Sequence, residues 1–293
     1  MQLDSTRIVI RERSFADILD LSLRVTSSYF GQLARRAALV TVPLMLLNHW
    51  LVGWMVRDAQ QAADVTRYLW TMGMLVFFEA PLMSVLITLF LGKALFLEES
   101  RWQDAVTVLR ETWFSLAWCQ LLLRSLAAAW WCVAVIGEGD PFGASECWLI
   151  ALFIYTLALR AGRPFINEII LLERNPLRSQ VPGTLTIGNR STLLHGPSGG
   201  KLVVEWFLSA ALALLLVWAV VGSVWFIRGT LFFDWSMDRV MLQLFIPMSM
   251  WIVASYLAVV RFMCYLDLRI RREGWEVLLL VRAASDQLRG TPT

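Results

Sequence analysis

Ionisable side chains lie deep inside stretches of the chain that are otherwise apolar. Glu79, Arg124 and Arg160 each fall ten or more residues inside such a stretch, roughly 15–20 Å from its outer end at 1.5 Å per helical residue. A charge at the centre of a bilayer costs at least about 2.5–3.5 kcal/mol, so each should face other helices. We expect Glu79 to pair with Arg124 or Arg160. Three roles stay open: an ion pair that fixes helix register, a site for an anion or anionic lipid head group, and a proton or ion pathway.

A second set of polar side chains lies near the end of the apolar stretch that contains Arg160. Arg163 and Asn167 are one helical turn apart, and Glu168 follows, so the sequence predicts a polar stripe on one helix face. Pro81 and Pro164 lie close by, and a proline inside a span frees a backbone carbonyl that can line a cavity. The stripe could close the cytoplasmic end of such a cavity. Equally, head groups and a neighbouring surface helix could satisfy it, and the prolines could be packing kinks.

The patterns that would indicate an enzyme are incomplete. Residues 196–200 match GxSxG, but no strand is expected before Ser198 and no histidine follows it. His49 and His195 are predicted on opposite membrane faces, and the four cysteines show no CxxC spacing, so no metal site or cofactor is expected. The net charge of +3 is small and the basic residues are dispersed, which indicates no nucleic-acid partner. The sequence therefore predicts a protein that is not an enzyme.

Six long apolar stretches must position these side chains. The chain is 58% hydrophobic and only 17% charged, well outside the range of soluble domains. Each stretch is long enough to cross a hydrocarbon core of about 30 Å as a helix. The sequence predicts an all-α, polytopic bundle with spans at residues 37–56, 69–91, 113–136, 147–172, 202–227 and 240–264.

The basic residues predict the orientation. Eighteen of the 26 lysines and arginines fall on the two termini and on alternate connections, and four fall on the other connections. The positive-inside rule then places both termini in the cytoplasm. Of these residues, 24 are arginine, a bias that indicates a GC-rich, bacterial genome. We therefore expect a bacterial source and hence the bacterial cytoplasmic (inner) membrane.

The cytoplasmic segments carry helices of their own. Residues 14–33 place apolar side chains at helical spacing behind a capping serine, Ser14, which predicts an amphipathic helix on the membrane surface. A weaker version of the same pattern precedes the third predicted span. It suggests three repeats, each made of a surface helix, a span that leaves the cytoplasmic side and a span that returns to it. The third repeat would be irregular, because residues 174–200 are rich in proline and glycine and are typical of a loop.

The tail beyond the last span is basic near the membrane. Arg269, Arg271 and Arg272 follow the sixth stretch directly and are expected to contact anionic lipid head groups. The predicted organisation is a cytoplasmic segment at 1–36, a six-span domain at 37–264, and a juxtamembrane helix and tail at 265–293.

Two stretches resemble known bacterial membrane proteins. Residues 163–177 (RPFINEIILLERNPL), with Arg190-Ser191 after them, resemble the centre of a group related to the membrane domain found ahead of some glycerophosphoryl diester phosphodiesterases. Residues 261–284 resemble the C-terminal end of uncharacterised bacterial six-helix proteins. The resemblance implies a six-helix domain with surface helices. It implies no activity, because the catalytic barrel of those phosphodiesterases is absent from this chain.

The leading hypothesis is a non-enzymatic membrane protein that scaffolds a complex or organises lipid at the cytoplasmic leaflet. The surface helices and the basic tail favour it. The alternative is a small transporter or channel for an anionic or lipid-like solute, built around Glu79, Arg124 and Arg160. A transporter needs these side chains in a water-accessible cavity, whereas a scaffold needs them in dry packing.

Overall fold

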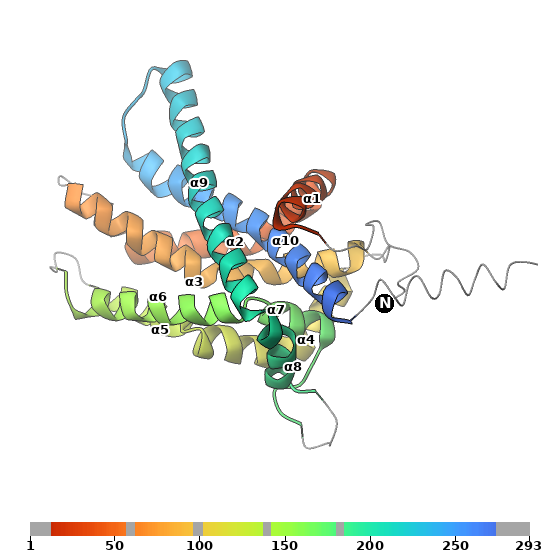
Figure 1. Ribbon diagram of the computed structural model, residues 1–293. Helices are drawn as coiled ribbons and strands as arrows, with labels where there is room; N and C mark the ends of the chain where they lie inside the picture. The colour runs from red at the N-terminus through yellow and green to blue at the C-terminus, as the bar shows by residue number, and fades with distance from the viewer. Residues whose placement is uncertain (1–12, 57–61, 96–101, 137–141, 180–184, 274–293) are drawn as a thin grey trace, which may run out of the picture.

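The computed structural model describes residues 13–56, 62–95, 102–136, 142–179 and 185–273. Every regular element within these ranges is a helix (Figure 1). The α-helices are α1 (Phe15–Ser28), α2 (Phe30–Val52), α3 (Ala62–Ala94), α4 (Trp102–Ala117), α5 (Leu126–Val135), α6 (Ala144–Gly162), α7 (Ile166–Glu168), α8 (Ile187–His195), α9 (Gly199–Phe232) and α10 (Ile246–Glu273). Short 3-10 turns are η1 (Gly53–Val56) and η4 (Gly196–Ser198), and π-helical turns are η2 (Trp118–Leu123), η3 (Ile169–Glu173) and η5 (Met241–Phe245).

Several helices are long and apolar enough to cross a membrane, which confirms the predicted all-α, multi-pass architecture. Five pass this test alone: Phe30–Val56, Asp64–Ala94, Ala144–Gly162, Ile187–Phe232 and Met241–Arg272. A sixth span results if Trp102–Leu123 and Leu126–Val135, bent by 49°, act together. The first predicted span started at residue 37, but α2 already begins at Phe30 and runs through that boundary.

The central helix of the bundle is α3, which packs against α2 on one side and α10 on another. Of its most apolar window, 78% is buried inside the protein, whereas the corresponding window of α9 is 0% buried. In Figure 1, α9 runs at a steep angle to α3 and α6, and its C-terminal end stands away from them. The surface of α9 is therefore left for lipid or for another protein to cover.

The N-terminal helix α1 is amphipathic and is held on the bundle. Ser14 and Asp17 form a reciprocal capping box, which confirms the predicted N-cap. The helix buries Ile18, Ser22 and Val25, and Tyr256 of α10 donates to the carbonyl of Leu19 at 3.1 Å. Figure 1 shows α1 nearly end-on while α3 and α6 lie across the view, so α1 runs across the direction of the spans. This is the orientation of a helix that lies at a membrane surface.

The segment expected to be a loop contains a helix. Within residues 174–200, α8 starts at Ile187, and the side chain of Thr186 caps it by accepting from Asn189 N. The loop prediction was wrong there because the prolines and all the glycines except Gly188 lie outside the helix in the sequence, and Gly188 falls in its first turn. Surface helices at comparable places do not by themselves establish a repeat, and the three repeats stay a prediction.

Candidate functional site: a polar junction between two broken helices

Two of the predicted spans are interrupted, and the interruptions meet. After the π turn η2, Arg124 and Ser125 leave helical geometry, and Ser125 is left-handed with φ 58°. The other break follows α6, where Arg163 has φ −138° and ψ 69° before Pro164. Arg124 Nη2 donates to the carbonyl of Arg163 at 2.9 Å, and Thr156 donates to the carbonyl of Arg124 at 3.2 Å. These hydrogen bonds thus connect the two breaks with each other.

The break at Pro164 follows from local chemistry. Proline has no N–H and disfavours helical geometry in the residue before it. The Phe165 N–H faces Nε2 of His195 at 3.4 Å, and the two rings stack at 5.6 Å. The break also overturns the predicted polar stripe, because Arg163 is exposed while Asn167 and Glu168 are both 0% exposed.

Arg160 is bonded to the backbone of the central helix. Pro81 cannot donate to the carbonyl four residues before it, which belongs to Phe77. Arg160 Nη1 donates to that carbonyl, and Nη2 donates to the carbonyl of Phe78 at 3.0 Å. Its guanidinium also lies 4.1 Å from the centre of the Phe77 ring, at cation–π distance. Arg160 therefore compensates the defect that Pro81 makes in α3.

Asn167 joins three elements at the level of this defect. Its Nδ2 donates to the carbonyl of Pro81 at 2.9 Å and to Ser84 Oγ at 3.2 Å, and its Oδ1 accepts from Gln120. Ser84 also accepts from Arg261 Nη2 at 2.6 Å. These bonds connect α3, η2, α7 and α10 inside the membrane-spanning part of the protein.

Arg261 and Glu168 form an ion pair at this level, with Nε and Oε1 2.9 Å apart. We call the whole set the polar junction: Ser84, Gln120, Arg124, Arg160, Asn167, Glu168 and Arg261. It holds three guanidinium groups and one carboxylate, and neither Arg124 nor Arg160 has a carboxylate at ion-pair distance among the described residues. The junction thus carries an excess of positive charge.

Glu79 lies outside this set, and its expected pairing with Arg124 or Arg160 is wrong. Its Oε2 accepts from Asn48 Nδ2 at 2.7 Å, and its Oε1 accepts from Trp130 Nε1 at 2.8 Å. Both partners are neutral side chains on α2 and α5. Arg160 reaches the neighbouring turn of α3 but bonds to the main-chain carbonyls of Phe77 and Phe78 there, and Pro81 leaves the first of these without its helical donor.

Packing buries Glu79 and every member of the junction except Arg261, whose side chain is 22% exposed. The exposed fractions are 0% for Glu79, Asn167 and Glu168, 2% for Arg124 and 7% for Arg160. Four buried polar atoms of the junction have no hydrogen-bond partner among the described residues: Gln120 Oε1, Arg124 Nε, Arg160 Nε and Glu168 Oε2. The arrangement is dry, and it satisfies most of the hydrogen-bonding groups that the broken helices expose.

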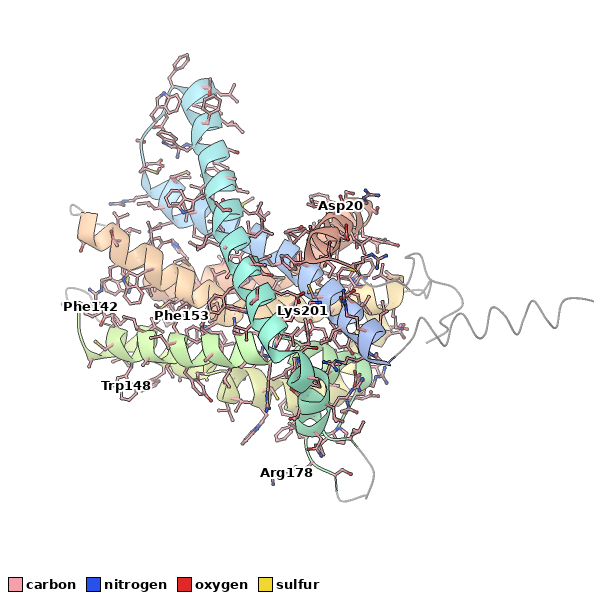
Figure 2. All side chains as sticks on the ribbon, viewed as in Figure 1. Asp20, Phe142, Trp148, Phe153, Arg178 and Lys201 are labelled. Atoms are coloured by element: carbon pink, nitrogen blue, oxygen red, sulfur yellow. The ribbon has the colours of Figure 1, made fainter. Side chains whose placement is uncertain are left out.

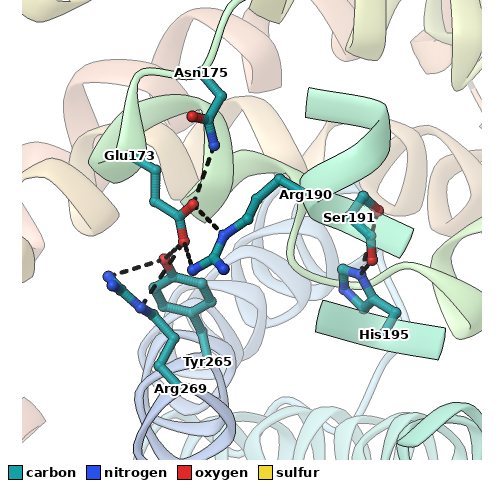
Figure 3. A network of polar contacts seen from close by, with 7 residues as sticks. All are labelled: Glu173, Asn175, Arg190, Ser191, His195, Tyr265 and Arg269. Atoms are coloured by element: carbon teal, nitrogen blue, oxygen red, sulfur yellow. Dashed lines mark hydrogen bonds and ion pairs between the residues drawn. The ribbon is translucent and has the colours of Figure 1, made fainter. Parts of the chain in front are cut away.

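A second network fastens α8 to the bundle (Figure 3). Glu173 accepts from Arg190 Nε at 2.5 Å and Nη2 at 2.9 Å and from the Tyr265 hydroxyl at 2.8 Å. Arg269 Nε lies 3.8 Å from the same carboxylate, and its Nη1 donates to Tyr265 Oη at 3.5 Å. Arg269, expected to contact head groups, is thus part of a protein-internal cluster.

The two other tail arginines also have protein partners. Arg271 donates to Asp267 Oδ2 at 2.7 Å and to the carbonyl of Arg13 at 2.6 Å, and Asp267 accepts from Arg13 N at 2.9 Å. Arg272 is exposed and donates to Ser198 Oγ. The N-terminal helix and the last helix are therefore clamped together. Contact of these arginines with anionic head groups stays a prediction, and the tail beyond residue 273 lies outside the described residues.

Sequence reasoning missed five residues of the polar junction and of the contacts of Glu79, and the available signals were weak. Ser84, Gln120, Asn48 and Trp130 are uncharged and stand singly in apolar stretches, so only their partners show their role. Arg261 is charged and lies within the sixth stretch, and its position inside a span could have placed it in the cluster.

Comparison of the chain with protein-family models, with curated proteins and with solved structures found no match. The resemblance to the membrane domain of some phosphodiesterases therefore stays a prediction that residues 163–177 and 261–284 carry.

Proposed function

We propose that this chain is a non-enzymatic, integral protein of a bacterial cytoplasmic membrane that organises lipid at the cytoplasmic leaflet. It crosses the membrane six times, with Trp102–Leu123 and Leu126–Val135 as one bent span and both termini in the cytoplasm. Binding of a partner protein in a membrane complex would use the same exposed surfaces.

The observation that carries this proposal is the dry polar junction. Its charged side chains bond to the carbonyls of Phe77, Phe78 and Arg163 and to each other. Arg124, Arg160 and Glu168 are at most 7% exposed, and the side chain of Arg261 is 22% exposed. Side chains that bind or conduct a solute must be accessible from water. Side chains that bond to backbone groups freed at a helix break are instead buried with those groups. The junction thus supports a rigid bundle whose binding surfaces lie outside it.

Two such surfaces support contact with lipid. The amphipathic helix α1 lies across the direction of the spans and exposes Leu23, which is 57% accessible. The helix α9 leaves large apolar side chains uncovered along its length, including Leu215 and Trp218 at 68% and 74% exposure. An isolated bundle with this surface would not stay soluble, and lipid chains cover it in a membrane.

A second candidate, transport of an anion, has one specific observation in its favour. The junction has three guanidinium groups against one carboxylate, and it lies between two broken helices. Transporters bind ionic substrates near the midplane with such discontinuous helices.

The two candidates are separated by reconstituting the full-length protein and by identifying its lipids. We expect native mass spectrometry of gently released protein to show stoichiometric phospholipid, and proteoliposomes to release chloride and phosphate no faster than protein-free liposomes. Anion release that Arg124→Leu abolishes, while the variant stays folded, would replace the lipid proposal with transport. Absence of any retained phospholipid would also contradict it.

A further inference from the structure

A polar cavity lies where α1, α9 and α10 meet, on the face predicted to be cytoplasmic. Its volume is about 200 Å³. Four charged side chains line it, Lys201 and Glu205 from α9 and Asp267 and Arg271 from α10. The rest of the lining is Ser198 and the apolar side chains of Ile18, Leu202, Cys264 and Leu268. Figure 2 labels Lys201 at the N-terminal end of α9, beside α10. This cavity is separate from the polar junction.

The charges in the cavity are balanced and arranged in pairs. Lys201 Nζ lies 3.4 Å from Glu205 Oε1, and Arg271 Nε lies 2.7 Å from Asp267 Oδ2. The side chain of Lys201 is 49% exposed, so its pair with Glu205 is weak and can be replaced by a ligand. A lining with two cations and two carboxylates favours a ligand that carries both signs of charge over a purely anionic one.

The start of α9 adds hydrogen-bond donors at the same place. Its N-cap, Ser198, also lines the cavity, and the Ser198 side chain does not cap the helix. The 3-10 turn η4 leads directly into α9 there, and a Cβ atom at Gly199 or Gly200 would meet nothing within 4 Å, so a phosphate can approach the backbone closely. Arg272 donates to Ser198 Oγ and brings another positive charge there.

We propose that this cavity binds the head group of a zwitterionic aminophospholipid. Its phosphate would meet Lys201 and the start of α9, and its ammonium group would meet Glu205 and Asp267. The inference rests on the proposed function, since it names the lipid class that the protein organises at its cytoplasmic face.

The size of the cavity and the surface beside it agree with a lipid held by its head group. A volume of about 200 Å³ is below the roughly 300–1,000 Å³ of pockets that enclose whole small-molecule ligands. Val204 and Leu208 follow three residues after Lys201 and Glu205 on the adjacent flank of α9, and they are 58% and 50% exposed. Acyl chains can lie along this flank while the head group occupies the cavity.

The chain offers a matched control, because Lys93 and Lys201 are its two lysines. Lys93 also forms an ion pair, to Asp104 at 2.7 Å, but it does not line the cavity. Full-length protein, Lys201→Gln and Lys93→Gln are titrated in detergent with phosphatidylethanolamine, phosphatidylglycerol or free phosphoethanolamine, and binding is read by native mass spectrometry.

We expect phosphatidylethanolamine to bind more tightly than the other two probes. Lys201→Gln should weaken its binding about tenfold, the factor for one lost charge-assisted hydrogen bond, and Lys93→Gln should leave it unchanged. Glu205→Gln should reduce the preference for phosphatidylethanolamine over phosphatidylglycerol, because it removes a partner of the ammonium group. Equal melting temperatures of the variants show that they are folded.

Three results would overturn the inference. Equal binding of both lipids, insensitive to Lys201→Gln, would leave lipid organisation standing and remove this site. Binding of free phosphoethanolamine as tight as that of the lipid would assign the cavity to a soluble phosphate ester. Failure of the protein to hold any phospholipid would remove the proposed function together with the inference.

Discussion

Removal of the Arg261 guanidinium should destabilise the protein more than removal of its carboxylate partner. Glu168 is 0% exposed, whereas the side chain of Arg261 is 22% exposed and also donates to Ser84. Arg261→Met leaves a fully buried carboxylate without a counter-charge at ion-pair distance among the described residues, and we expect it to lower the free energy of unfolding by about 3–5 kcal/mol. In Glu168→Gln the Arg261 guanidinium keeps its hydrogen bond to Ser84 and stays partly exposed, so the expected loss of unfolding free energy is smaller, about 1.5–3 kcal/mol.

The double variant tests whether the two side chains act as a pair. It removes both charges, so its loss of stability should be at least about 2 kcal/mol smaller than the sum of the two single losses. The assay is equilibrium unfolding of the full-length protein in mixed micelles, driven by increasing fractions of sodium dodecyl sulfate and followed by circular dichroism.

An exposed pair supplies the control. Arg24 Nη2 and Asp20 Oδ2 are also 2.9 Å apart, but their side chains are 76% and 61% exposed. Arg24→Met and Asp20→Asn should each change the unfolding free energy by less than about 0.5 kcal/mol. The reasoning is refuted if Arg261→Met is as mild as Arg24→Met, or if the two junction substitutions are additive.

Three further substitutions or conditions test local features. Ser125→Gly should raise the unfolding free energy by about 1 kcal/mol, because glycine adopts the left-handed geometry at φ 58° without strain; a lower value would contradict this. Ser14→Ala should cost about 1 kcal/mol through loss of the capping box and should speed amide hydrogen exchange in the first turn of α1, while exchange in α3 stays unchanged. The hydrogen bonds that Asp238 accepts from Arg228 and from Met241 N lower the pKa of its carboxyl group, so their stabilisation is complete above the ordinary pKa of about 4 and is lost as pH falls through the lowered value. Hydrogen exchange at residues 233–240, corrected for its intrinsic pH dependence, should therefore rise in acid. Asp238→Asn should reduce that rise but not remove it, because Asp234, which also pairs with Arg228, has a lowered pKa as well.

The spans and the first surface helix could be predicted because each depends on local sequence. A stretch of about twenty apolar residues suffices to identify α3 or α10, whatever its neighbours are. The start of α1 is similarly local, since the capping box needs only Ser14 and Asp17. Pro164 gave a visible signal for the break in the fourth span as well.

The partners inside the bundle could not be predicted because they depend on how the helices pack. Charge alone favoured a Glu79–arginine pair, but packing brings the neutral Asn48 and Trp130 to Glu79. No glycine or proline in the sequence around Ser125 indicates the break there. The hydrogen bond from Arg124 to the carbonyl of Arg163 helps to stabilise this break. A defect in one helix that a side chain of another repairs becomes visible only in the folded chain.

The most direct test of the dry junction uses the cysteines that the chain already has. Cys119 is buried and precedes Gln120 of the junction, whereas Cys147 is exposed near the start of α6. Membranes that contain the intact protein are treated with a small, water-soluble thiol reagent, and each cysteine is quantified by mass spectrometry. We expect rapid labelling of Cys147 and labelling of Cys119 only after denaturation. Rapid labelling of Cys119 in the folded protein would show that water reaches the junction, and would contradict its assignment as dry and structural.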